Sequence, residues 1–154
     1  MTTSPSTQAV LGWREWVCLP ELGIAQLKAK VDTGARSSSL HAFDIHTEDI
    51  DGELWVHFKV HPHQHDNDET VCCRAKVKDY RQVTDSGGHR SMRYVIETAL
   101  QLGKEHIVAE VTLADRSDML FRMLIGRTAM SGRYVVDPSR SYCVSQAKPS
   151  ISTP

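Results

Sequence analysis

The chain has 154 residues, of which 40% are hydrophobic and 24% are charged, and its formal net charge is −1. This length supports one domain with one core, and the near-neutral charge excludes a global field that would steer the protein to nucleic acid or to an anionic membrane. An aromatic content of 6% also argues against a nucleic-acid partner. No run approaches the roughly 18 apolar residues of a membrane span, so we expect no membrane partner.

In chain order, the alternation of apolar and polar residues predicts strands rather than helices. A strand is expected over residues 13–19, followed by a turn at 20–23. Further strands are expected over residues 24–31, 53–60, 70–77, 93–100, 107–113 and 119–125, with a hairpin turn at 102–104 and one helical turn at 128–131. About eight short strands separated by turn signals predict an all-β domain, either a closed barrel or a sandwich.

The chain ends and the cysteines bear on domain limits and compartment. Residues 1–8 have neither the basic residue nor the apolar core of a secretory signal. Of the four cysteines, Cys72 and Cys73 are adjacent, and no Cys-x-x-Cys pair exists. We therefore expect reduced thiols and a cytoplasmic protein. The predicted organisation is a disordered arm over residues 1–10, one domain over 11–145 and a flexible tail over 146–154.

Asp32-Thr33-Gly34-Ala35 directly follows the strand expected over residues 24–31. Gly34 permits a sharp backbone reversal that a side chain would hinder, and such a turn presents the carboxylate while backbone N–H groups hydrogen-bond to it. Tripeptides of this kind are also common as ordinary Asx turns, and the motif alone favours that interpretation.

Two later segments give the motif a context. Ile125-Gly126-Arg127 ends an apolar strand, and the glycine-rich stretch Ser86-Gly87-Gly88-His89-Arg90 lies at a hairpin tip between the two. This order resembles that of the retropepsins. There the Asp-Thr-Gly loop carries the catalytic carboxylate, the Gly-Arg segment forms its interlocked partner, and the glycine-rich hairpin is the mobile flap.

The resemblance narrows to a bacterial family over about residues 11–144. It is carried by Trp16-Val17-x-Leu19-Pro20, the run from Ala29 to Arg36, Leu40-His41-Ala42, Gly126-Arg127 and the run from Val136 to Tyr142. Members of this family have been labelled ATP-dependent zinc proteases, and it includes the RimB proteins associated with the RimK glutamate ligase. The resemblance implies a closed retropepsin-like β-barrel with a flap hairpin and a short helix near the C-terminus. It also implies a cytosolic peptidase that trims the glutamate tails that RimK adds to a ribosomal protein.

The sequence contains no recognisable binding motif for ATP or for catalytic zinc. It contains neither an HExxH motif nor a GxxxxGK[ST] loop. His57, His61, His63, His65 and Asp66 have a spacing that a transition metal can use. The polar residues around them favour a solvated loop instead, so we expect no metal and no cofactor.

The expected mechanism requires a second chain. Aspartic peptidase chemistry needs two carboxylates that share one proton, and the chain has one Asp-Thr-Gly. A symmetric homodimer would place Asp32 against its own copy. The resemblance implies that Thr33 reaches across to the other subunit, and a local turn hydrogen bond is the alternative for that side chain.

Arg36 departs from the retropepsin pattern, in which the residue after Asp-Thr-Gly-Ala is usually acidic and pairs with the arginine of the Gly-Arg motif. Here Arg36 and Arg127 repel unless an acid separates them or Arg36 faces the cleft. In the second case Arg36 joins basic residues at the flap to bind a glutamate-rich substrate, because arginine binds carboxylates bidentately. In the other interpretation Arg36 caps a turn or pairs with Asp115, Asp118 or Asp137.

Two functions follow from these residues. The first is an aspartic endopeptidase that acts on acidic segments, and the alternative is a monomeric, non-catalytic module that binds acidic tails. The expected catalytic residues are Asp32, Thr33 and Gly34, with Ile125, Gly126 and Arg127 as structural support. The expected substrate-binding residues are Ala35, Arg36, Ser86, Gly87, Gly88, His89, Arg90 and Arg93.

Overall fold

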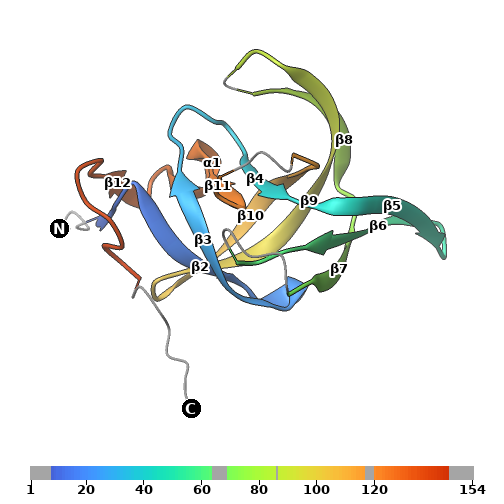
Figure 1. The fold of residues 1–154 in the computed structure, drawn as a ribbon, viewed down its shortest axis with the longest axis horizontal. Coiled ribbons are helices and arrows are strands. Elements are labelled where there is room, and N and C mark those ends of the chain that lie inside the picture. Colours follow the sequence, from blue (N-terminus) through green and yellow to red (C-terminus); the bar gives the residue numbers. More distant parts are fainter. Residues whose placement is uncertain (1–7, 64–68, 86, 117–119, 146–154) are drawn as a thin grey trace, which may run out of the picture.

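The computed structural model describes residues 8–63, 69–85, 87–116 and 120–145, and most of them lie in strands (Figure 1). One large sheet has the strand order β10-β4-β11-β3-β2-β9-β8, and an additional pairing joins β10 to β9. This pairing joins the first strand of the order to the next-to-last one, so β10, β4, β11, β3, β2 and β9 form a near-closed ring, and β8 is added to β9. Its strands are β2 (Arg14–Leu19), β3 (Ile24–Val31), β4 (Ser38–His41), β8 (Asp79–Thr84), β9 (Arg90–Leu102), β10 (Glu105–Ala114) and β11 (Met123–Ile125).

Two smaller sheets flank the ring. Strands β5 (Phe43–Ile50), β6 (Glu53–Val60) and β7 (Val71–Lys76) form an antiparallel sheet on the right of Figure 1. Strands β1 (Ala9–Leu11) and β12 (Tyr134–Val136) pair in parallel. The helical elements are η1 (Pro20–Leu22) and α1 (Arg127–Met130).

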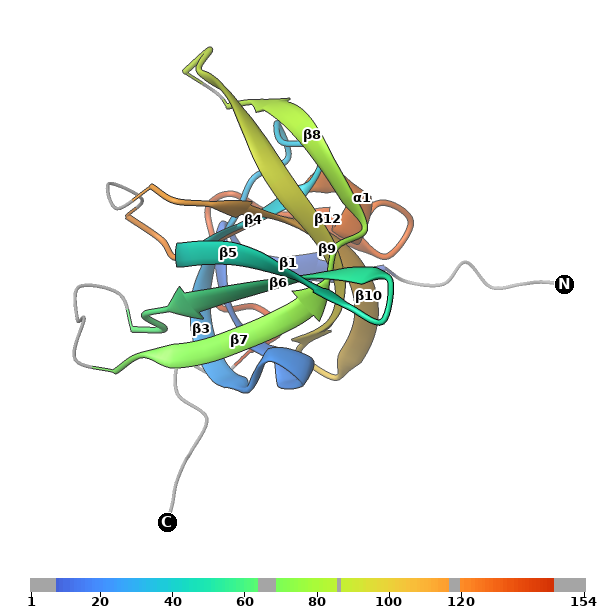
Figure 2. The same cartoon turned by 90° about the vertical axis from the view of Figure 1, so that its right-hand side faces the viewer.

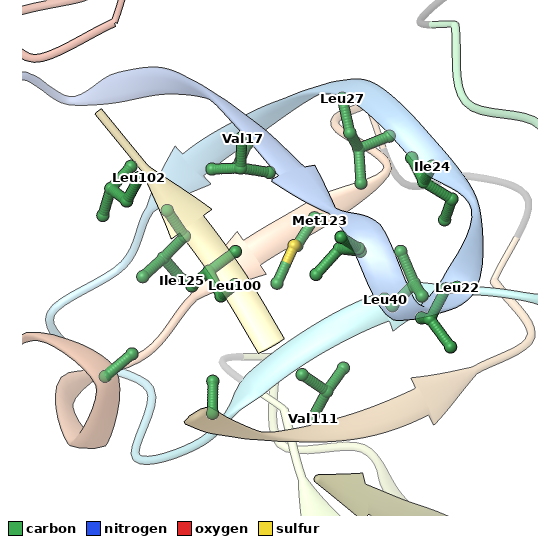
Figure 3. Close-up of a cluster of buried hydrophobic side chains, with 14 of the residues drawn as sticks. Val17, Leu22, Ile24, Leu27, Leu40, Leu100, Leu102, Val111, Met123 and Ile125 are labelled. Atoms are coloured by element: carbon green, nitrogen blue, oxygen red, sulfur yellow. The ribbon is translucent and has the colours of Figure 1, made fainter. Parts of the chain in front are cut away.

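The core fills the ring because inward-facing residues alternate along its strands. Leu27, Leu40, Leu100, Met123 and Ile125 are completely buried, and they come together from four different strands (Figure 3). Truncating one such leucine to alanine typically costs about 2–5 kcal/mol of stability. The core therefore holds β3, β4 and β11, the strands that carry the motif loops, in a fixed relation.

The long strand β9 leaves the ring and pairs with β8 to form a protruding hairpin, which we call the flap (residues 79–95). Its register runs from Asp79 opposite Val95 to Thr84 opposite Arg90. Figures 1 and 2 show the flap extending beyond the rest of the molecule. It arches over the side of the ring on which the β3–β4 connection lies (Figure 1).

The all-β prediction and the retropepsin-like fold are confirmed, and the differences lie in individual elements. Strands 24–31 and 53–60 have the predicted bounds, whereas β11 begins only at Met123, and the predicted start at residue 119 lies outside the described residues. Strands β4, β5, β8 and β12 were not predicted, because β4 is short and serine-rich and β5 and β8 are largely exposed and polar. Strand β1 begins at Ala9, inside the predicted arm, because pairing with β12 orders it.

Candidate active site

The Asp32 loop joins β3 to β4 and is shaped by backbone hydrogen bonds. The Asp32 N–H donates to Ile125 O (2.9 Å), and the Ala35 N–H donates to Asp32 O (3.2 Å). The Gly34 N–H donates to the Asp32 carboxylate at Oδ1 (3.0 Å). A Cβ on Gly34 would lie 3.3 Å from the same oxygen, so glycine keeps the approach to the carboxylate open. Asp32 is half-buried, and Thr33 and Gly34 are exposed.

The Gly126 segment locks into this loop. Strand β11 lies between β3 and β4, parallel to the first and antiparallel to the second. The Arg127 N–H donates to Ala35 O (2.7 Å), and the Gly126 N–H donates to Ser38 Oγ (3.1 Å). A Cβ on Gly126 would collide with the backbone of Ser37, so only glycine allows this close approach. The two motifs, about 90 residues apart in the chain, are thus one structural unit.

The two arginines near this unit have different surroundings. Arg127 Nη1 donates to the carbonyl oxygens of Thr33 (3.3 Å) and Gly34 (3.1 Å), so its charge is directed at the Asp32 loop. Arg36 is exposed, and it does not line the cavity next to Asp32.

No ion pair of Arg36 is found within the part of the chain that the structure describes, so the pairings considered with Asp115 and Asp137 do not form. Asp118 lies outside the described residues.

A cavity of about 480 Å³ opens beside Asp32, and we call it the Asp32 cavity. Its lining combines the motif loop, the flap and the β10–β11 connection. The lining residues are Trp13, Lys30, Asp32, Gly34, Ala35, Ser39, Val83, Thr84, Asp85, Arg93, Ala114, Arg116, Leu120, Phe121 and Leu124. The apolar wall includes Phe121, which contacts Trp13 edge-to-face with ring centroids 5.8 Å apart. The carboxylate therefore borders a space of the size that ligand-binding clefts have.

The flap residues proposed from sequence take different positions. Arg93 lies in the wall of the Asp32 cavity, whereas Gly87, Gly88, His89 and Arg90 are exposed and do not line it. Ser86 lies outside the described residues.

Sequence reasoning set aside Asp85 and passed over Arg116, yet these two form an ion pair beside Asp32. Asp85 Oδ1 also accepts the N–H groups of Gly87 and His89 (both 2.9 Å). The His89 N–H, the Gly87 N–H and the nearby charges of His89 and Arg116 lower the pKa of Asp85. Asp115 and Arg116 follow the strand predicted over residues 107–113. Charged residues in a loop just after a strand commonly border a site, and this was the signal that could have identified Arg116.

His41 positions Arg116. The Arg116 N–H donates to His41 Nδ1 (3.1 Å), and the imidazole is 3% exposed. Burial lowers the pKa of His41, which favours the neutral ring. The same Nδ1 lies 3.2 Å from Ala114 O, and the Arg116 N–H also donates to Ala114 O (3.0 Å), so the tautomer decides whether Nδ1 donates to Ala114 or accepts from Arg116. The Leu40-His41-Ala42 motif thus does not line the Asp32 cavity itself but contacts Ala114 and Arg116, which do.

The histidine cluster is divided between two places. His57 lies on β6, where Nε2 is 2.8 Å from Glu48 Oε1 and the ring stacks on His46. His63 instead contacts Glu69 (2.7 Å) beyond the end of β6. No group of three ligand side chains converges anywhere in the described ranges, and His65 and Asp66 lie outside them.

A near-closed β ring, an Asp-Thr-Gly loop interlocked with a Gly-Arg segment, and a flap over their cavity define a retropepsin-like domain. A family model described as "RimB-like: Retropepsin-like aspartic endopeptidase RimB" matches residues 10–147. The chain belongs to this family.

Curated relatives extend the comparison. A protein of Shewanella halifaxensis is 44% identical over 137 residues, and one of Desulfotalea psychrophila is 46% identical over 130 residues. Both are named probable alpha-L-glutamate ligase. The matches cover 89% and 84% of this chain, but only 30% and 28% of those relatives. The chain therefore spans less than a third of the length of these relatives.

Among solved structures, a Legionella pneumophila protein of unknown function has a TM-score of 0.74 and 25% sequence identity. The match covers 90% of this chain and all of that one. Within the described residues, no helix is long and apolar enough to cross a bilayer.

Proposed function

We propose that the protein is an aspartic endopeptidase that cleaves peptide bonds in acidic, glutamate-rich segments, such as the tails that RimK adds to a ribosomal protein. The observation that carries the proposal is the Asp32 carboxylate, which borders a flap-covered cavity in a chain of the RimB-like family. Its four cysteines are free, which suits a reducing compartment, and we propose a cytoplasmic location.

The reaction needs a second carboxylate, and Asp32 of another copy is the best candidate. Asp85 pairs with Arg116, and Asp137 accepts hydrogen bonds from Ser139 (Oγ, 2.6 Å). Arg116 favours the ionised form of Asp85, and Ser139 favours the ionised form of Asp137. Neither aspartate therefore suits a role in which the carboxyl group must hold a proton. In a symmetric dimer, one Asp32 removes a proton from water while the protonated Asp32 of the partner subunit donates to the carbonyl oxygen. The water oxygen adds to the carbonyl carbon, and the tetrahedral intermediate then breaks its C–N bond as the Asp32 that took the water proton gives it to the leaving amine. The other Asp32 recovers its proton from the hydroxyl that becomes part of the new carboxyl group.

Two observations support an acidic substrate. The chain matches one part of longer proteins that are named probable alpha-L-glutamate ligase. A domain similar to this chain therefore occurs within proteins that bear that name. The Asp32 cavity is also lined by Lys30, Arg93 and Arg116. Cations in a partly enclosed cleft attract carboxylates more strongly than the neutral net charge of the chain suggests.

Hydrolysis of a glutamate-tailed peptide by wild type and by Asp32→Asn tests the proposal. The substitution preserves shape and removes the shared proton, so hydrolysis should be lost while the fold persists. Asp137→Asn is the matched control, because it removes a carboxylate that does not line the cavity. Chelator should leave activity unchanged. Residual turnover of more than a few per cent in Asp32→Asn, or zinc-restored activity after chelation, would exclude the mechanism. A monomeric wild type that binds the peptide without cleaving it would favour the non-catalytic module.

A further inference from the structure

Arg93 is a buried cation without a carboxylate partner among the described residues. It is only 7% exposed, and its N–H groups donate to the hydroxyls of Ser91 (Nε to Oγ, 3.0 Å) and Ser39 (Nη1 to Oγ, 3.3 Å). Burial and, next, the charge of Arg116 lower the pKa of Arg93, whereas the charge of Asp85, which forms no ion pair with it, raises that pKa by a smaller amount. An arginine still remains charged at neutral pH. A buried charge paired only with hydroxyl dipoles is costly, and an anion beside it would relieve that cost.

Arg116 supplies a second guanidinium that lines the same space. It lies on the β10–β11 connection, whereas Arg93 lies on the flap, and both line the Asp32 cavity. Arg116 pairs with Asp85 at the tip of the flap. This ion pair ties the flap to the β10–β11 connection, so it closes one side of the space that a substrate would enter.

A second cavity of about 620 Å³, which we call the outer cavity, meets the Asp32 cavity at this ion pair. Both cavities are lined by Asp85, Arg93, Ala114 and Arg116. The remaining lining of the outer cavity includes the apolar surfaces of Tyr80, Met92 and Tyr94. The Asp85–Arg116 pair therefore lies on the border that the two cavities share.

We propose that Arg93 and Arg116 form a subsite for a side-chain carboxylate of the substrate, and that Asp85 holds Arg116 until such a carboxylate replaces it. The inference rests on the proposed function only in assuming that a peptide enters the Asp32 cavity. A glutamate side chain offers Arg116 the same group that Asp85 offers, and it can contact Arg93 as well. The exchange releases Asp85 from Arg116, so the flap is no longer attached to the β10–β11 connection. The Asp32 cavity and the outer cavity then become continuous. Acidic residues in the substrate are thus both recognised and required for entry.

Calorimetric binding to Asp32→Asn protein tests the subsite without any need for hydrolysis. The probes are an acetylated, amidated pentaglutamate peptide, whose only carboxylates are on side chains, and its pentaglutamine counterpart. Pentaglutamate should bind more tightly. Adding Arg116→Gln should weaken pentaglutamate binding about tenfold or more, since it removes a charge-assisted contact, and should leave pentaglutamine binding unchanged. Arg93→Lys, which keeps the charge but loses the planar fork, should also weaken pentaglutamate binding.

Two further variants sharpen the result. Asp85→Asn keeps the Oδ1 acceptor for the flap turn but removes the competing charge, so pentaglutamate affinity should rise several-fold. Arg36→Gln, which alters an exposed guanidinium outside the cavity, should have no effect. Equal affinity for both peptides, a loss of affinity in Arg36→Gln rather than Arg116→Gln, or an unchanged affinity in Asp85→Asn would overturn the proposal. A wild type that fails to hydrolyse peptide would refute the peptidase function and leave these binding results standing.

Discussion

Gly126 shows how one residue without a side chain sets the geometry of the candidate site. Its N–H donates to Ser38 Oγ, and its Cα lies so close to Ser37 that no Cβ fits. This contact lets the next residue, Arg127, donate its backbone N–H to Ala35 and its guanidinium to the carbonyls of Thr33 and Gly34. The position of the Asp32 carboxylate therefore depends on a glycine on another strand.

Gly126→Ala should destabilise the protein by about 1–3 kcal/mol or more, because the added methyl group forces the Ser37 backbone to move. Gly87→Ala is a suitable control, since its added Cβ would contact only His89 and Asp85 side-chain atoms at 3.2 Å or more. Urea unfolding of both variants measures the difference. Equal stability of Gly126→Ala and wild type would contradict the interlocked geometry, and so would a larger loss in Gly87→Ala.

At the scale of elements, the flap is held at both its base and its tip. Near its base, Arg81 on β8 pairs with Glu110 on β10 (Nη2 to Oε2, 3.0 Å). At the tip, Asp85 organises the turn through the N–H groups of Gly87 and His89 and pairs with Arg116. The tip attachment depends on one ionised carboxylate, whereas the base also has strand pairing between β9 and β10. We therefore expect the tip to be released first when the pH falls.

The contribution of Asp85 to stability should depend on pH. Because its pKa is lowered in the folded protein, the ionised carboxylate stabilises the fold at pH values above the unfolded pKa of roughly 3.9. This contribution is lost as the pH falls through the lower folded value. The difference in unfolding free energy between wild type and Asp85→Asn should be constant from neutral pH to about pH 5. It should shrink at lower pH. A difference that grows on acidification would contradict the ion pair, and urea unfolding across this range would detect it.

At the scale of the whole molecule, the candidate site faces outward. Asp32 is half-buried, its neighbours Thr33 and Gly34 are exposed, and the flap covers the cavity from one direction. One chain presents one such loop. A second copy would have to approach from the side of the exposed loop to bring the two carboxylates together.

Mixing experiments should show whether two chains share one active site. If the dyad joins two copies, an equal mixture of wild type and Asp32→Asn leaves about one quarter of the dimers with two wild-type subunits, because symmetric dimers exchange subunits at random. At the same total protein concentration, peptidase activity should then fall to about one quarter of that of pure wild type. Sedimentation should give the mass of a dimer. A monomeric mass, or an activity that falls only to one half, would contradict the shared dyad.

The sequence alone determined those features that depend on local pattern. Alternation of apolar and polar residues indicated β6, and indicated β3 from Leu27 onward, since a half-buried strand exposes every second residue to water. The preference for glycine at residue 34 was also readable, because a sharp backbone reversal favours that residue type, whereas the close contact that requires glycine at residue 126 was seen only in the structure. Local pattern was sufficient for the all-β class, whereas the retropepsin-like barrel and the interlock of the two motifs were predicted from the resemblance to the retropepsins.

The tertiary structure decided which charges meet. Arg36 and Arg116 are indistinguishable as sequence features, but closure of the ring leaves the first exposed and brings the second to the Asp32 cavity beside Arg93. Strands β4 and β8 likewise lack a hydrophobic pattern and are formed by pairing with β10, β11 and β9. Periodicity reports only whether a residue is buried. Which distant residues share a cavity depends on the register and closure of strands far apart in the chain.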